Sequence, residues 1–118
     1  MEFKQRDDGS YWPPIIPNGK FYAKAVGQPR AQHLFSVTAT GLVAGGISYD
    51  WSEIAGISIQ GDEVQLVSYK YPSGGFRFVL SDCLLENEQG VDLHTIDGYT
   101  VDYCLLNRIT FESMKLGR

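Results

Sequence analysis

The sequence contains few of the residues that build reactive centres or covalent frameworks. Among its 118 residues are two cysteines and two histidines. Cys83 and Cys104 are too few for a disulfide framework and lack the spacing of a zinc site, so we interpret both as packing residues. His33 and His94 do not show the helical spacing of paired metal ligands. These shortages favour a non-catalytic protein that uses no metal ion or other cofactor.

Long apolar runs and clusters of positive charge are also missing. No apolar stretch approaches the roughly 20 residues of a membrane-spanning helix, and the chain opens without the apolar segment of a secretory signal. We therefore expect a cytoplasmic protein. The formal net charge is -4 and no run of Lys or Arg occurs, whereas nucleic-acid-binding domains normally present a basic face. This charge balance argues against nucleic acid and anionic membranes as partners, and the sequence leaves the oligomeric state open.

Short apolar runs separated by turn residues are, by contrast, abundant. The chain has 13 glycines, 7 tyrosines and 6 phenylalanines, which favours β structure because turns use glycine and strands favour aromatic residues. Alternation of apolar and polar residues predicts six antiparallel strands. The predicted strands are 21–26, 33–40, 43–49, 57–59, 64–69 and 76–80. Within the third, Gly45-Gly46 is interpreted as a bulge.

Two pairs of apolar residues are predicted to be structural. Trp51 and Ile54 are three positions apart, so one turn of non-extended chain places both on the same side. We expect the Trp51 ring to close one end of the β structure while its N–H donates to a carbonyl group. Phe76 and Phe78 flank a charged residue and are expected on the buried face of the last strand.

The N-terminal residues 1–19 are interpreted as an extended arm that precedes a single β domain of residues 20–118. Three prolines between positions 13 and 17 exclude a helix there. Large apolar residues beside the prolines favour an arm that lies across the domain and covers an edge or an open core; these are Tyr11, Trp12, Ile15 and Ile16. The alternative is a proline-rich ligand for the aromatic groove of a partner.

A C-terminal helix is predicted over about residues 100–115, with Thr100 as its candidate N-cap. Its apolar stripe is expected to consist of Val101, Cys104, Leu105, Ile109 and Met114. A competing interpretation makes residues 109–112 a last strand, because Thr and Phe are mediocre helix formers.

The order of features in the middle of the chain is similar to that of a known family. A strand ending at Thr38 is followed by Gly41-Leu42, a strand from Ile47, the element Trp51-Ser-Glu-Ile54, and alternating strands that contain Ile57, Leu66 and Phe78. Over about residues 33–80 this order resembles bacterial pleckstrin-homology-like (PH-like) or GRAM-type domains. The resemblance implies a partly open barrel, or two-sheet antiparallel sandwich, of six to seven strands with one C-terminal helix.

The same resemblance implies a binding or a structural role, because members of such families bind phosphoinositides, peptides or other proteins, and some are purely structural. A phosphoinositide site in this family needs clustered basic residues on the first hairpin. Lys20, Lys24 and Arg30 occupy that region without the close basic pair of a phosphate clamp. This spacing argues against a membrane lipid as the ligand.

Negative charge is concentrated in one part of the chain. Residues 81–107 contain no Lys or Arg. We interpret the carboxylates of this segment as a binding face for a basic protein, which they would attract over a distance; the candidate residues are Asp82, Glu86, Glu88, Asp92 and Asp97. The alternative is a solvated loop that keeps the protein soluble.

The favoured hypothesis is therefore a non-catalytic protein-interaction module with a PH-like fold, acting through the acidic face of residues 81–102 or through a strand edge. A first alternative is a small cytoplasmic immunity protein, an inhibitor that neutralises a basic toxin. A second is a small-ligand-binding barrel or enzyme, which requires a sizeable closed pocket with converging polar groups.

Overall fold

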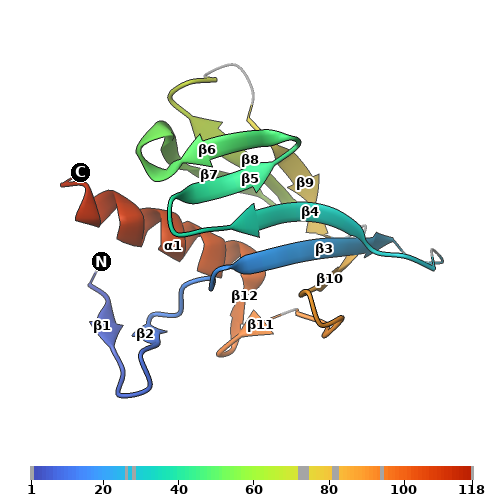
Figure 1. Ribbon diagram of the computed structural model, residues 1–118, viewed down its shortest axis with the longest axis horizontal. Helices are drawn as coiled ribbons and strands as arrows, with labels where there is room; N and C mark the ends of the chain where they lie inside the picture. Colours follow the sequence, from blue (N-terminus) through green and yellow to red (C-terminus); the bar gives the residue numbers. More distant parts are fainter. Residues whose placement is uncertain are drawn as a thin grey trace.

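Two antiparallel sheets and one long helix form most of the structure, a computed structural model of the chain (Figure 1). The structure describes residues 2–25, 27, 29–71, 75–80, 83–93 and 95–117, and of Cys83 only the backbone. The predicted fold class, mainly β with a C-terminal helix, is confirmed. The sheets do not close into a barrel, in keeping with the sandwich form of the prediction.

The larger sheet has five strands in the order β10-β3-β4-β5-β6. Its strands are β3 (Gly19–Ala25), β4 (Gln32–Val37), β5 (Gly41–Ala44), β6 (Ile47–Asp50) and β10 (Cys83–Glu86). The first four follow one another along the chain, and β10 returns to pair with β3. The two edge strands of this sheet are therefore β10 and β6.

The smaller sheet has three strands in the order β7-β8-β9. These are β7 (Ile54–Gln60), β8 (Glu63–Ser68) and β9 (Arg77–Val79). Two short hairpins complete the β structure, and each pairs only with itself. They consist of β1 (Lys4–Gln5) with β2 (Tyr11–Trp12), and β11 (Thr95–Ile96) with β12 (Tyr99–Thr100).

The predicted strand over residues 43–49 is wrong, because Gly45-Gly46 is a turn and not a bulge. Both glycines have positive φ, 59° and 76°, and they connect β5 to β6 through a two-residue hairpin loop. Positive φ at both central residues is the requirement of the tight turn that fits the twist of paired strands. The prediction also omitted the two short hairpins and β10, which lies inside the acidic segment.

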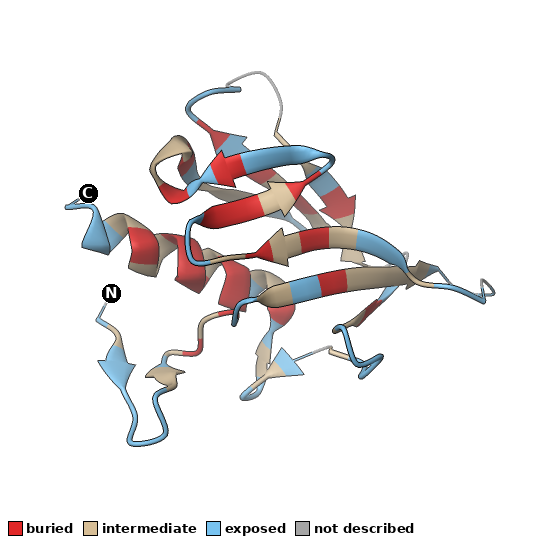
Figure 2. Cartoon of the chain, viewed as in Figure 1, coloured by how far each residue is buried: buried red, intermediate tan, exposed pale blue. Residues whose placement is uncertain are grey.

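The core lies between the two sheets, where inward-facing residues of both are buried (Figure 2). Phe21 and Phe35 stack with ring centroids 5.0 Å apart. A 3-10 turn, η1 (Trp51–Glu53), joins the sheets. Trp51 and Ile54 are both buried, and the Trp51 Nε1–H donates to the carbonyl oxygen of Ala39 at 3.1 Å.

The helix α1 (Val101–Lys115) covers one end of the sandwich and contacts β7 and η1. Four members of the predicted stripe are buried, whereas Met114 is 46% exposed and the prediction for it is wrong. In the C-terminal half of the helix the buried face is largely polar. Asn107, Arg108 and Glu112 are buried there beside Ile109. Thr100 occupies the N-cap position, and its side chain makes no capping hydrogen bond. Among the described residues, no helix is long and apolar enough to cross a membrane.

Gly41 is a position where the packing of β5 against β6 requires glycine. A Cβ atom at this residue would collide with the carbonyl oxygen of Tyr49, a backbone atom that cannot rotate away. We expect Gly41→Ala to lower the free energy of unfolding by about 1–3 kcal/mol, as overpacking typically does. Urea denaturation provides the measurement. The matched control is Gly56→Ala, since a Cβ at Gly56 meets open space; equal losses in both variants would contradict the steric argument.

Candidate functional site

Glu86 and Asp92 face each other in a short hairpin that extends β10. The Leu93 N–H donates to the Leu85 carbonyl at 2.7 Å, and the Asn87 N–H donates to the Val91 carbonyl at 3.1 Å. These two bonds flank the bridge between Glu86 and Asp92, which makes it a non-hydrogen-bonded antiparallel pair. In such a pair the two side chains share one face of the strands and lie close together. The structure therefore places two carboxylates of the predicted acidic face opposite each other.

Two exposed aliphatic residues, Leu84 and Val91, lie near this pair along the chain. Leu84 precedes Glu86 by two positions on the same strand, so both point to the outer face of the five-stranded sheet. We call the five residues here the acidic lip: Leu84, Glu86, Glu88, Val91 and Asp92. Glu88 is held in place, because its Oε1 accepts a hydrogen bond from the Lys20 backbone N–H at 3.0 Å. Within the part of the chain that the structure describes, none of the three carboxylates forms an ion pair with Lys or Arg.

Asp97, a further candidate of the predicted acidic face, is paired with the arm. Asp97 lies in the turn between β11 and β12, where its Oδ2 is 3.5 Å from Arg6 Nη1 of the N-terminal arm. Asp82 lies outside the described residues. Among the described candidates, Glu86, Glu88 and Asp92 thus lie in the hairpin beside β10, and Asp97 lies beside the arm.

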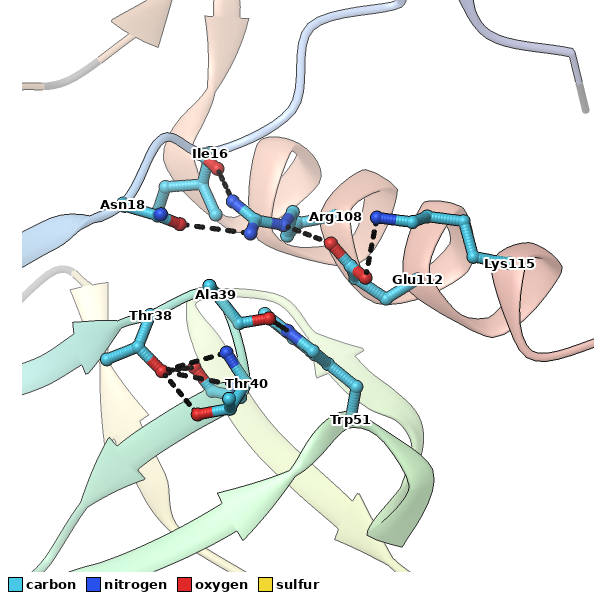
Figure 3. A network of polar contacts seen from close by, with 10 residues as sticks. Ile16, Asn18, Thr38, Ala39, Thr40, Trp51, Arg108, Glu112 and Lys115 are labelled. Atoms are coloured by element: carbon cyan, nitrogen blue, oxygen red, sulfur yellow. Dashed lines mark hydrogen bonds and ion pairs between the residues drawn. The ribbon is translucent and has the colours of Figure 1, made fainter.

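Arg108 is the centre of a second polar site, which joins α1 to the arm (Figure 3). Its Nε donates to Glu112 Oε1 at 3.0 Å, its Nη1 to the Ile16 carbonyl at 3.0 Å, and its Nη2 to Asn18 Oδ1 at 2.9 Å. The guanidinium carbon also stands 5.1 Å from the centre of the Trp51 ring. Arg108 and Glu112 are both buried, so each requires the other to offset its loss of water.

Two further hydrogen bonds fasten the extended part of the arm to the same helix. Asn107 Nδ2 donates to the Pro14 carbonyl at 2.9 Å, and the Ile16 N–H donates to the Cys104 carbonyl at 3.1 Å. Pro14 and Ile16 are fully buried there. An open groove of about 510 Å³ remains between arm and helix, with Phe111, Glu112 and Lys115 on the helix side. Because Arg108 and Glu112 bind each other and the arm, we interpret this site as an anchor for the arm.

The space between the sheets, where a ligand-binding barrel would hold its ligand, is nearly filled. It measures about 10 Å³ and is lined by apolar side chains that include Phe35, Leu66, Phe78 and Leu105. Ligand pockets are usually in the range of roughly 300–1,000 Å³ and contain a few polar groups. The ligand-binding alternative therefore gains no support from this interior. Phe78 is buried in it, and Phe76 is partly buried beside it.

His33 and Cys104 lie on different elements, β4 and α1. His33 is exposed on β4, with Nε2 2.7 Å from Ser36 Oγ, and His94 lies outside the described residues. Within the described ranges, no group of three or more His, Cys, Asp or Glu side chains is arranged to hold a metal ion. Cys104 is fully buried in α1, and burial, together with the negative charges of Asp102 and Asp97, raises the pKa of its thiol to about 11.

Comparison with models of known protein families, with curated proteins and with solved structures finds no match to this chain.

The sequence signals for the arm anchor were weak for a physical reason. Charged residues are seldom fully buried, so the sequence by itself gives no reason to place Arg108 and Glu112 inside the domain. Their four-residue spacing permits an ion pair on any helix. The distinguishing partners are Ile16, Asn18 and Trp51, which no local pattern relates to α1.

Removing Arg108 should destabilise the whole domain. Arg108→Met leaves Glu112 buried without its partner and frees two acceptors on the arm, so we expect a loss of about 3–5 kcal/mol in urea denaturation. The control Lys115→Met removes an exposed partner of the same carboxylate and should cost less than about 1 kcal/mol. Arg108→Met/Glu112→Leu should recover part of the loss, because the uncompensated charge is gone. Equal losses in Arg108→Met and the control would contradict the anchor.

The buried thiol of Cys104 should be unreactive at neutral pH. In a Cys83→Ser variant, which leaves Cys104 as the only thiol, a pKa of about 11 leaves only about one thiolate per thousand molecules at pH 8. A chromogenic disulfide reagent should then label the protein only as it unfolds. The raised pKa also makes the free energy of unfolding depend on pH. Because the thiol has a pKa of about 11 in the folded protein and 9.0 in the unfolded chain, its contribution to stability is complete below pH 9 and is lost as the pH rises through about 11. Labelling of the native protein at the rate of a free thiol would contradict this.

Proposed function

We propose that this chain is a non-catalytic protein-interaction module of PH-like architecture that binds a basic partner through the acidic lip. The topology supports the architectural part of the proposal. A four-stranded meander, β3 to β6, is followed by a three-stranded meander, β7 to β9, and then by a helix at one end of the sandwich. Two antiparallel sheets with a helix at one end are the architecture that the resemblance to PH-like domains implies, whereas β10 and the hairpin of β11 and β12 stand between β9 and the helix. The helix and the anchored arm leave the lip exposed.

The observation that carries the proposal is the direct opposition of Glu86 and Asp92. Like charges placed opposite each other on neighbouring strands destabilise the pairing. A Lys or Arg of a partner would turn this repulsion into attraction, so the free protein holds an arrangement that favours a cationic ligand. The exposed side chain of Leu84, on the same face as Glu86, adds apolar area that a partner would remove from water. Carboxylates at the rim chiefly accelerate association and make it sensitive to salt.

A double substitution separates binding from stability. Glu86→Gln/Asp92→Asn removes the repulsion, so we expect the free protein to gain about 0.2–1 kcal/mol of stability in urea denaturation. The same variant should capture less of the partner from an extract of the source cells at low salt. The control Glu2→Gln/Asp7→Asn makes the same change in net charge on the arm, away from the lip. It should leave both stability and capture close to those of the unchanged protein.

The two measurements decide between the lip as an interface and the lip as a solubility feature. Undiminished capture by the lip variant would contradict the proposal, even if the gain in stability appears. The affinity distinguishes the inhibitor alternative. Capture of one basic protein with a nanomolar Kd that weakens steeply with salt would indicate an immunity protein, whereas weak binding to several basic proteins would indicate an interaction module.

A further inference from the structure

Three aromatic rings form a row on the surface where the arm meets the C-terminal part of the chain. Trp12 of β2 meets Tyr99 of β12 edge to face, with ring centroids 5.3 Å apart, and Tyr99 stacks on Tyr103 of α1 at 5.3 Å. Despite these contacts Trp12 remains 40% exposed and Tyr103 37% exposed. We call these three residues the aromatic row. In the view of Figure 1, β2, the hairpin of β11 and β12, and the chain that follows β10 succeed one another along the lower side of the molecule.

One end of the row already holds a guanidinium group. The Arg6 guanidinium carbon stands 4.8 Å from the centre of the Trp12 ring, and Arg6 Nη1 is 3.5 Å from Asp97 Oδ2. Both charged side chains remain exposed, at 40% for Arg6 and 46% for Asp97. An exposed ion pair of this kind is weak in water. The space between Trp12 and Asp97 therefore accommodates a guanidinium group, and the Arg6 side chain that occupies it is only weakly bound.

We propose that the aromatic row and Asp97 form a binding patch for an arginine side chain of the basic partner, with Arg6 as its stand-in in the free protein. This proposal rests on the proposed function, from which it takes the positive charge of the partner. A Trp face attracts a cation, most strongly where a neighbouring carboxylate balances the charge. Trp, Tyr and Arg are also the residues that contribute most to protein interfaces.

The chemistry of the patch favours arginine over lysine. The planar guanidinium stacks on an aromatic face and presents parallel N–H groups to a carboxylate, whereas the lysine ammonium is a compact and strongly hydrated charge. The acidic lip has no aromatic member, and Tyr22, which pairs with Glu86, is half-buried and contacts His33 edge to face, so the lip's attraction for cations should differ less between the two residues. The two surfaces therefore make separable contributions to the binding of a basic ligand.

Octa-arginine and octalysine peptides provide the probes, and isothermal titration of the full-length protein provides the Kd values. We expect octa-arginine to bind roughly three- to tenfold more tightly than octalysine, the range of a partly exposed cation–π contact. Trp12→Leu should abolish this preference and leave octalysine binding unchanged. Tyr103→Leu, on the helix, is a second test that leaves the arm intact. Urea denaturation of each variant shows that it is folded.

Removing the stand-in gives the sharpest test. Arg6→Gln vacates the patch, so the preference for octa-arginine over octalysine should rise about twofold or more. The control Arg77→Gln removes another exposed arginine that is paired with a carboxylate, Glu63. It makes the same change in net charge and should strengthen both peptides equally. An unchanged or smaller preference in Arg6→Gln would overturn the proposal.

The outcomes also separate this proposal from the acidic lip. If octalysine and octa-arginine bind equally and Glu86→Gln/Asp92→Asn weakens both, the patch is wrong and the lip stands. If the arginine preference depends on Trp12 but the lip variant binds as tightly as the unchanged protein, the patch stands and the lip is wrong. If neither peptide binds at low salt, both proposals are overturned.

Discussion

The buried guanidinium of Arg108 is the interaction on which most of this structure depends. It binds Glu112 on its own helix, Ile16 and Asn18 on the arm, and the face of Trp51 at the junction of the two sheets. Taking a cation and a carboxylate out of water is unfavourable, and one ion pair seldom offsets that loss. In this protein, the hydrogen bonds from Arg108 to the arm and its contact with the Trp51 ring add the stabilisation that the ion pair alone lacks. One side chain thereby fixes the helix, the arm and the end of the sandwich relative to one another.

The same anchor determines which surfaces remain for binding. Because Pro14 and Ile16 are fastened along α1, the hairpin before them is carried to the side of the molecule where Tyr99 and Tyr103 lie. Trp12 joins these rings only through that placement, and Arg6 reaches Asp97 in the same way. The stability of the arm and the existence of the aromatic row are therefore coupled, since loss of the anchor would separate Trp12 from its neighbours.

The acidic segment shows how an extended strand redistributes charges that are close in the sequence. In the predicted loop, all five candidate carboxylates could share one face. The strand β10 instead turns alternate side chains to opposite sides of the sheet, and the hairpin after it brings Asp92 back to Glu86. Asp97 is carried onward to the arm. Both proposed surfaces thus use parts of one segment, yet they recognise a cation differently, by paired carboxylates in one case and by an aromatic face in the other.

Local patterns in the sequence determined the β class, most of the strands, the terminal helix and the burial of Trp51 and Ile54. These features depend on neighbours within a few positions, where alternation, turn residues and helical spacing act directly. Tertiary structure alone decided that β10 completes the sheet, and that Asn107, Arg108 and Glu112 are buried. Arg108 meets Ile16 across 92 positions of the chain. Whether a charged residue is buried depends on the partner that the fold brings to it, and no local pattern contains that partner.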